Sequence, residues 1–225
     1  CQVPDIALDF ALGLGTTRVG AALSVVRHAD APAPLTLRGD GLTPLAVRVD
    51  GESWNDWHME GPDLIVDLGD RTHAVVEVDT AIDPATNTQL MGLYASNGML
   101  CTQCEAEGFR RITFHPDRPD VLSRYKVRMT GDKTAFPILL SNGNCVAKGE
   151  SDDGRHWALW EDPWPKPSYL FALVAGDLVV NRDHFTTLSG RKVDLGIWVR
   201  AGDEDRTHHA MQALKNSMAW DERVY

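Results

Sequence analysis

The chain has 225 residues, with 32 acidic and 22 basic side chains and a formal net charge of −10. It contains no cluster of Lys and Arg that would form an electropositive stripe, so we expect no nucleic-acid partner. No apolar run approaches the roughly 20 residues that cross a bilayer, and the first residues lack a basic-then-apolar signal pattern. We therefore expect a soluble chain without a membrane partner, although a sequence that starts at Cys1 rather than Met leaves targeting open.

Alternating apolar and polar residues dominate the first part of the chain. Ile6, Leu8 and Phe10 alternate with smaller or polar residues, which is the two-residue period of a strand that buries one face. The same period recurs between turn signals such as Asp50-Gly51 and predicts a meander of short strands. The strands expected here cover residues 6–12, 19–25, 45–49 and 76–78.

The second part of the chain predicts a hairpin and further strands. Residues 145–151 and 155–161 flank Asp152-Asp153-Gly154, a sequence typical of a hairpin turn with glycine at positive φ. The prolines of segment 163–167 cannot donate ladder hydrogen bonds, so a loop is predicted there. The strands expected after it are an apolar one at 169–175, one near Phe185 and one at 193–199.

Only at the end of the chain does the spacing of apolar residues change from the two-residue period of strands to that of a helix. After the acidic residues 203–205, which suit a helix amino terminus, Met211, Leu214 and Met218 recur at spacings of three and four. The sequence therefore predicts a mainly β fold closed by one amphipathic helix. Because no Gly or Pro stops this helix, we expect the natural protein to continue beyond Tyr225.

The densest cluster of polar residues lies in segment 101–108, between two β-like runs. If the segment is extended, alternation places Gln103, Glu105 and Glu107 on one face. One amide and two carboxylates could receive a cationic ligand group, because charge-assisted hydrogen bonds are roughly twice as strong as neutral ones. The alternative is an ordinary solvated strand face, since glutamates are mostly exposed.

Cysteine spacing gives weak signals of its own. Cys101 and Cys104 have the spacing of a zinc half-site or a redox pair, but no second ligand pair follows and the surrounding pattern is β on both sides. Buried or half-buried free thiols are the better interpretation. Four cysteines in total do not form a disulfide framework, so reduced thiols in a cytoplasmic protein are expected.

Motifs of hydrolytic chemistry are missing from the sequence. No two of the eight histidines are four residues apart, so the H-E-x-x-H zinc motif is absent, and no G-x-S-x-G elbow or P-loop occurs. We therefore expect no catalytic residue and no metal ligand in this chain.

Several segments resemble one known family, the aminopeptidase N (alanyl aminopeptidase) type of zinc metallopeptidase, in particular its bacterial form. The resemblance is strong from about Asn87 to the end and looser before it. The segments that carry it are Asn87-Thr88-Gln89-Leu90, Gly92-Leu93-Tyr94, residues 101–110, residues 117–122, residues 139–144, residues 154–157, residues 166–177 and residues 214–222.

The resemblance implies a saddle-shaped, mostly antiparallel, multi-sheet β-sandwich over residues 1–202. Residues 203–225 would form a helix leading into a catalytic domain that this chain lacks. It also implies that Glu105 binds the free α-amine of a peptide and that Gln103 lines the same subsite. The family has a cis peptide bond after this glutamate, in which case Glu107 would not share the face of Glu105.

Two functional hypotheses follow. The first is the substrate-cleft domain of a zinc aminopeptidase, with a peptide carrying a free amino terminus as partner and zinc held by the rest of the parent enzyme. This chain alone would then be inactive, because G-A-M-E-N and H-E-x-x-H are absent. The second is a stand-alone β-sandwich binding or interaction module without catalysis.

Overall fold

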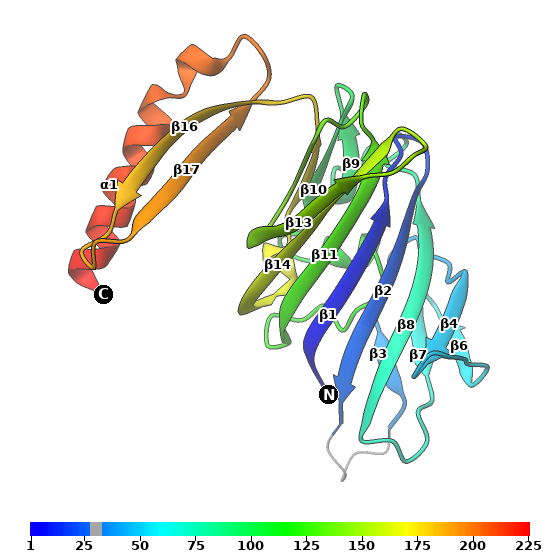
Figure 1. Cartoon of the computed structure of the whole chain (residues 1–225). Helices are drawn as coiled ribbons and strands as arrows, with labels where there is room; N and C mark the ends of the chain where they lie inside the picture. The colour runs from blue at the N-terminus through cyan, green and yellow to red at the C-terminus, as the bar shows by residue number, and fades with distance from the viewer. Residues whose placement is uncertain (28–32) are drawn as a thin grey trace. The chain divides into compact units, whose positions relative to one another are not determined.

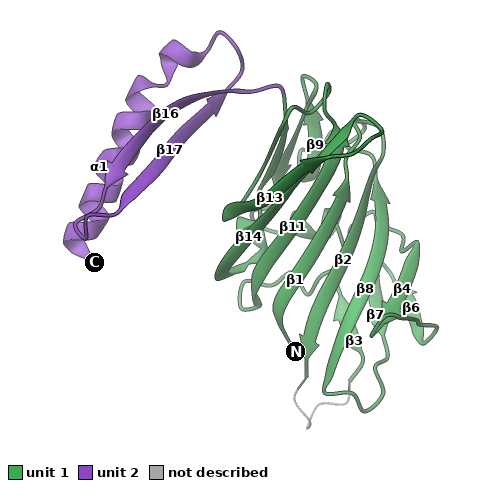
Figure 2. Ribbon diagram, viewed as in Figure 1, with its two compact units in different colours: residues 1–176 green, residues 177–225 purple. Residues whose placement is uncertain are grey.

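The computed structural model describes residues 1–27 and 33–225 (Figure 1). It divides into two compact units, Cys1–Gly176 and Asp177–Tyr225 (Figure 2). The first unit contains sheets of eight, four and three strands, and the second contains a two-stranded sheet and a helix. The predicted mainly β fold with several antiparallel sheets and a C-terminal α-helix is confirmed.

The eight-stranded sheet organises the first unit. Its strands, in sheet order, are β13 (Asn144–Glu150), β14 (Arg155–Pro167), β11 (Leu122–Asp132), β1 (Gln2–Ala11), β2 (Thr17–Val26), β8 (His73–Ile82), β4 (Ala46–Val49) and β5 (Glu52–Ser53). Neighbours in this sheet pair antiparallel except β1 and β11, which run parallel. Figure 1 shows β14, β11, β1, β2 and β8 of this sheet side by side.

Alternation along the strands determines which face of this sheet is buried. In β1, Ile6, Leu8 and Phe10 are buried, whereas the intervening residues are more exposed. Their partners in β2 continue the apolar face, since Phe10 lies opposite the buried Val19. The alternation predicted for residues 6–12 and 19–25 therefore corresponds to the side chains that these strands bury in the core.

Two smaller sheets complete the first unit. The strands of the four-stranded sheet are, in order, β12 (Ile138–Ser141), β15 (Leu173–Gly176), β10 (Met99–Gln103) and β9 (Gly92–Ser96). Those of the three-stranded sheet are β3 (Leu35–Leu37), β7 (Asp63–Val66) and β6 (Trp57–Glu60). The short 3-10 helices η1 (Phe109–Arg111) and η2 (Ser168–Leu170) lie in connections.

An aromatic cluster joins the large sheet to these connections. Phe109 of η1 packs edge-on against Phe171, with ring centroids 5.3 Å apart, and against Tyr125 of β11 at 6.1 Å. Phe10 of β1 stacks on Phe171 at 6.2 Å. Because aromatic rings bury large apolar areas, this cluster fixes η1 against the large sheet.

Two local predictions in the second half of the first unit were wrong. Segment 163–167 belongs to β14, because the register shifts between Asp162, opposite Tyr125, and Lys166, opposite Ser123. Between these two pairs the chain advances by four residues on β14 and by only two on β11. The extra residues form a bulge that contains Pro163 and Pro165. The apolar run 169–175 divides into η2 and β15, because Phe171 turns into the aromatic cluster.

The second unit is a hairpin with a helix. Its elements are β16 (Val179–Thr186), β17 (Lys192–Val199), the 3-10 helix η3 (Glu204–Arg206) and α1 (His208–Val224). The predicted helix is confirmed, with Met211 buried, while the acidic residues 203–205 lie before it. Lys215 of α1 pairs with Asp183 of β16. The boundary expected at residue 202 stays a prediction.

None of the helices in the described part of the chain has the length and apolar character required to span a membrane.

Candidate substrate-binding site

The segment that carries Glu105 is a tight turn between β10 and η1. The backbone N–H of Gly108 donates to the carbonyl of Cys104 at 2.8 Å and closes the turn. The peptide bond between Glu105 and Ala106 is cis, as the family resemblance implied. The extended arrangement considered for segment 101–108 is wrong beyond Gln103, the last residue of β10.

The two glutamates of this turn have different environments. Glu107 Oε1 lies 3.3 Å from Arg110 Nη2, so its charge is already paired. Glu105 is exposed, and within the described residues its carboxylate has no ion-pair or hydrogen-bond partner. An exposed carboxylate without a protein cation is available to a cationic ligand.

Gln103, the last residue of β10, contacts the backbone of Glu105. Its side-chain Nε2 donates to the backbone carbonyl of Glu105 at 3.1 Å. The structure therefore brings the two predicted site residues together, while their predicted role stays a prediction. The same bond holds the backbone of Glu105 toward the end of β10.

A pocket of about 260 Å³ lies at this turn. Three segments form its walls, namely the turn itself, the loop after His115 and η2. The lining residues are Glu105, Ala106, Glu107, Asp117, Arg118, Pro119, Ser168 and Tyr169.

Asp117 links its own loop directly to η2, and it reaches the turn through Arg110, which pairs with Glu107. Its carboxylate, only 1% exposed, accepts a hydrogen bond from Arg110 Nε at 2.7 Å and another from Ser168 Oγ at 2.5 Å. Asp117 was not among the site residues predicted from the sequence, although it lies in one of the segments that carry the family resemblance. The family resemblance was the available signal for Asp117. Its contact with Ser168 could not be read from the local sequence, because the two residues are 51 positions apart in the chain.

The cysteines at positions 101 and 104 are structural thiols in this fold. Cys101 is half-buried, Cys104 is buried, and both are free, as predicted. Burial, together with the nearby charge of Asp117, raises the pKa of Cys104 to about 12. A thiol that stays protonated at neutral pH is a poor nucleophile and a poor metal ligand.

The described residues do not provide a zinc site. No group of three or more His, Cys, Asp or Glu side chains in residues 1–27 and 33–225 is arranged to hold a metal ion. The residues present therefore do not fit the catalytic metal that the resemblance implies for a parent enzyme.

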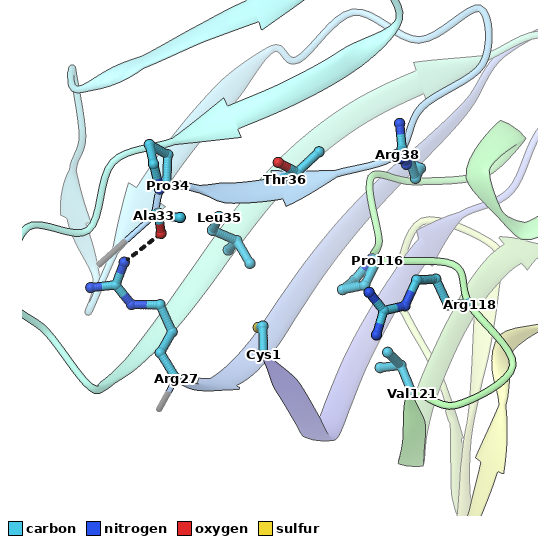
Figure 3. Close-up of a pocket in the computed structure, with 10 residues that line it drawn as sticks. All are labelled: Cys1, Arg27, Ala33, Pro34, Leu35, Thr36, Arg38, Pro116, Arg118 and Val121. Atoms are coloured by element: carbon cyan, nitrogen blue, oxygen red, sulfur yellow. Dashed lines mark hydrogen bonds between the residues drawn. The ribbon is translucent and has the colours of Figure 1, made fainter. Parts of the chain in front are cut away.

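A second pocket, of about 230 Å³, is lined by Arg27, Arg38 and Arg118 together with apolar side chains (Figure 3). Its guanidinium groups are already engaged. Arg27 donates to backbone carbonyls, including that of Ala33 at 3.0 Å, as the dashed line in Figure 3 shows. Arg38 pairs with Asp63, and Arg118 pairs with Asp120. Because these donors have partners, this pocket is a weaker candidate than the one at Glu105.

Comparisons with known proteins show the family of the chain. Residues 54–170 match the family described as Peptidase M1 N-terminal domain. The whole chain is 51% identical to aminopeptidase N of Escherichia coli K12 and spans 26% of its length. It is 50% identical over 221 residues to aminopeptidase N of Caulobacter vibrioides, covering 97% of this chain and 25% of that protein.

A solved structure shows the same fold at full coverage. The crystal structure of Legionella pneumophila aminopeptidase A in complex with aspartic acid superposes with a TM-score of 0.92 and 32% sequence identity. The match covers 100% of this chain and 27% of that one. The chain thus spans about a quarter of the length of the relatives it matches. It belongs to the family of M1 peptidase N-terminal domains.

Proposed function

We propose that this chain is the non-catalytic N-terminal domain of a zinc aminopeptidase that removes amino-terminal residues from peptides, and that it supplies the part of the substrate cleft that binds the α-amine. The family match over residues 54–170, which include the turn at Glu105, supports this proposal. The names of the relatives, which are aminopeptidases, support it as well.

The carboxylate of Glu105, which has no partner among the described residues, is the observation that carries the assignment. An exopeptidase must recognise a terminal ammonium group, and a carboxylate forms a charge-assisted hydrogen bond with it. An internal peptide bond offers no such charge, so the same contact discriminates between the terminus and the interior of a peptide. Glu107, which already pairs with Arg110, is less suited to this role.

Gln103 has an orienting role in the proposal. Its bond to the carbonyl of Glu105 holds that residue beside the end of β10. A fixed amino terminus also fixes which carbonyl of the peptide is presented to the reacting groups, and such positioning is a large part of catalysis.

Zinc and the bond-breaking chemistry belong, in this proposal, to the rest of the longer protein. The resemblance to the aminopeptidase N type of zinc metallopeptidase, together with the relatives named aminopeptidase N, supports a zinc-dependent parent. The free thiols support a cytoplasmic location.

Replacing Glu105 in the full-length protein tests the proposal. Glu105→Gln keeps the size of the side chain and removes its charge, so the KM for a peptide with a free amino terminus should rise about tenfold or more. Zinc content should not change. The matched control is Glu60→Gln, a substitution at an exposed glutamate of β6. An unchanged KM for free amino termini in the Glu105→Gln enzyme would refute the proposed function.

A further inference from the structure

The carboxylate of Glu105 is held in place only through its backbone. Within the described residues its side chain has no partner, so the position of the carboxylate follows from the turn 104–108. One side of this turn is anchored by β10 and Gln103. The other side continues into η1 and needs an anchor of its own.

Arg110 of η1 provides the connection to that second anchor. Its Nε donates to Asp117 Oδ2 at 2.7 Å, its Nη2 donates to the Asp117 carbonyl at 3.2 Å, and its backbone N–H lies 3.3 Å from Oδ2. The same guanidinium pairs with Glu107 at 3.3 Å. A single arginine thus ties the turn to Asp117 by both side chain and backbone.

Asp117 is itself fixed by contacts on its other sides. Ser168 Oγ donates to Oδ1 at 2.5 Å, which links Asp117 to η2 and to the opposite wall of the pocket. The backbone N–H of Asp117 donates to Nδ1 of the buried His115 at 3.0 Å. A carboxylate that is 1% exposed and has both oxygens bonded is a rigid anchor.

We propose that Asp117 is a positioning residue for Glu105: it holds the turn through Arg110 and the pocket wall through Ser168, and so sets where the α-ammonium of a substrate is received. This rests on the proposed function of Glu105. The physical reason is that a binding group must be held within a fraction of an ångström by residues whose own contacts are fixed. Asp117 itself does not need to touch the substrate.

Two hydroxamates that differ only in the amine provide the readout in the full-length enzyme. Alanine hydroxamate carries the free amine, and propionohydroxamate has the same skeleton without it. Asp117→Asn should weaken inhibition by alanine hydroxamate about tenfold and leave inhibition by propionohydroxamate unchanged. A variant that is merely less stable would affect both inhibitors alike.

A double-mutant cycle separates positioning from an independent effect. In the Glu105→Gln background, Asp117→Asn should change neither inhibition constant further, because the group that it positions has lost its charge. Additive effects, or no selective loss in Asp117→Asn, would overturn the inference while leaving the proposed function intact. If Glu105→Gln itself does not selectively weaken inhibition by alanine hydroxamate, the proposed function of Glu105 is refuted, and with it the basis of this inference.

Matched variants guard against loss of folding and against general charge effects. Asp5→Asn removes a half-exposed carboxylate that pairs with Arg124 on the large sheet. Neither residue lines the pocket at Glu105, so this variant should leave the ratio of the two inhibition constants unchanged. A shift equal to that of Asp117→Asn would overturn the inference. If Asp117→Asn does not fold, Ser168→Ala removes only one of the contacts and should shift the ratio in the same direction by a smaller factor. An unchanged ratio in that folded variant would then overturn the inference.

Discussion

At position 115 a histidine with no exposed surface serves as a hydrogen-bond acceptor. Because the backbone N–H of Asp117 donates to Nδ1, the ring proton is on Nε2, which has no partner within the described residues. Burial lowers the pKa of His115 to about 4, although the nearby charge of Asp117 acts in the opposite direction. The native state therefore holds this imidazole neutral.

His115 makes the fold sensitive to mild acid. Between pH 7 and pH 5 the unfolded histidine, with an ordinary pKa near 6.5, takes up a proton that the native one does not. The free energy of unfolding should therefore fall by about 2 kcal/mol over this interval through His115 alone. Urea unfolding at both pH values should show this loss in the natural chain and not in His115→Asn. Equal losses in the two proteins would contradict the prediction.

Single residues also show what the sequence could reveal about the site. Gln103 and Glu105 were predicted through the family resemblance, because the bare pattern of polar residues fits an ordinary solvated strand face better. Asp117 was not predicted. Its importance depends on Arg110 and Ser168 meeting it in space, and no local pattern encodes a contact across 51 positions.

At the scale of elements, the turn after β10 passes very close to β9. A Cβ added at Gly108 would lie 2.4 Å from the Gln103 carbonyl oxygen and 3.0 Å from the backbone nitrogen of Gly92. Backbone atoms cannot move aside as a flexible side chain can. Glycine is therefore required where this turn crosses the neighbouring strand.

Gly108→Ala should displace the turn and destabilise the chain. Overpacking of this kind costs about 1–3 kcal/mol, and chemical denaturation measures it. In the full-length protein the same variant should weaken binding of free amino termini, because the displaced turn carries Glu105. Gly15→Ala is the control, since a Cβ there meets nothing within 4 Å. Equal stability of the two variants would show that the turn adapts at no cost.

Elements with regular alternation were predictable, and elements shaped by distant partners were not. The strands expected at 6–12 and 19–25 formed because each buries one face. Segment 163–167 was predicted as a loop from its prolines. It joins β14 because the pairing with β11 tolerates a bulge there, and this register is a property of two strands rather than one.

At the scale of the whole chain, we predict that the fold described here forms without a metal ion. The residues of the described ranges contain no ligand cluster, and hydrophobic packing forms the core. We expect the chain to unfold at the same temperature with zinc or with a chelator, and to release no amino acid from a chromogenic alanine substrate. Calorimetry and the corresponding hydrolysis assay test these two statements. Stabilisation by equimolar zinc but not by magnesium would contradict the first.

The parallel pairing of β1 and β11 has a consequence for synthesis on the ribosome. Asp5 and Arg124, which face each other in the sheet, are 119 positions apart. At about 5–20 residues per second, roughly 6 to 24 s pass between translation of the two strands. During that interval β1 can pair with β2 while its other edge stays open. The charges of Asp5 and Asp9 on this strand discourage a neighbouring nascent chain from adding there.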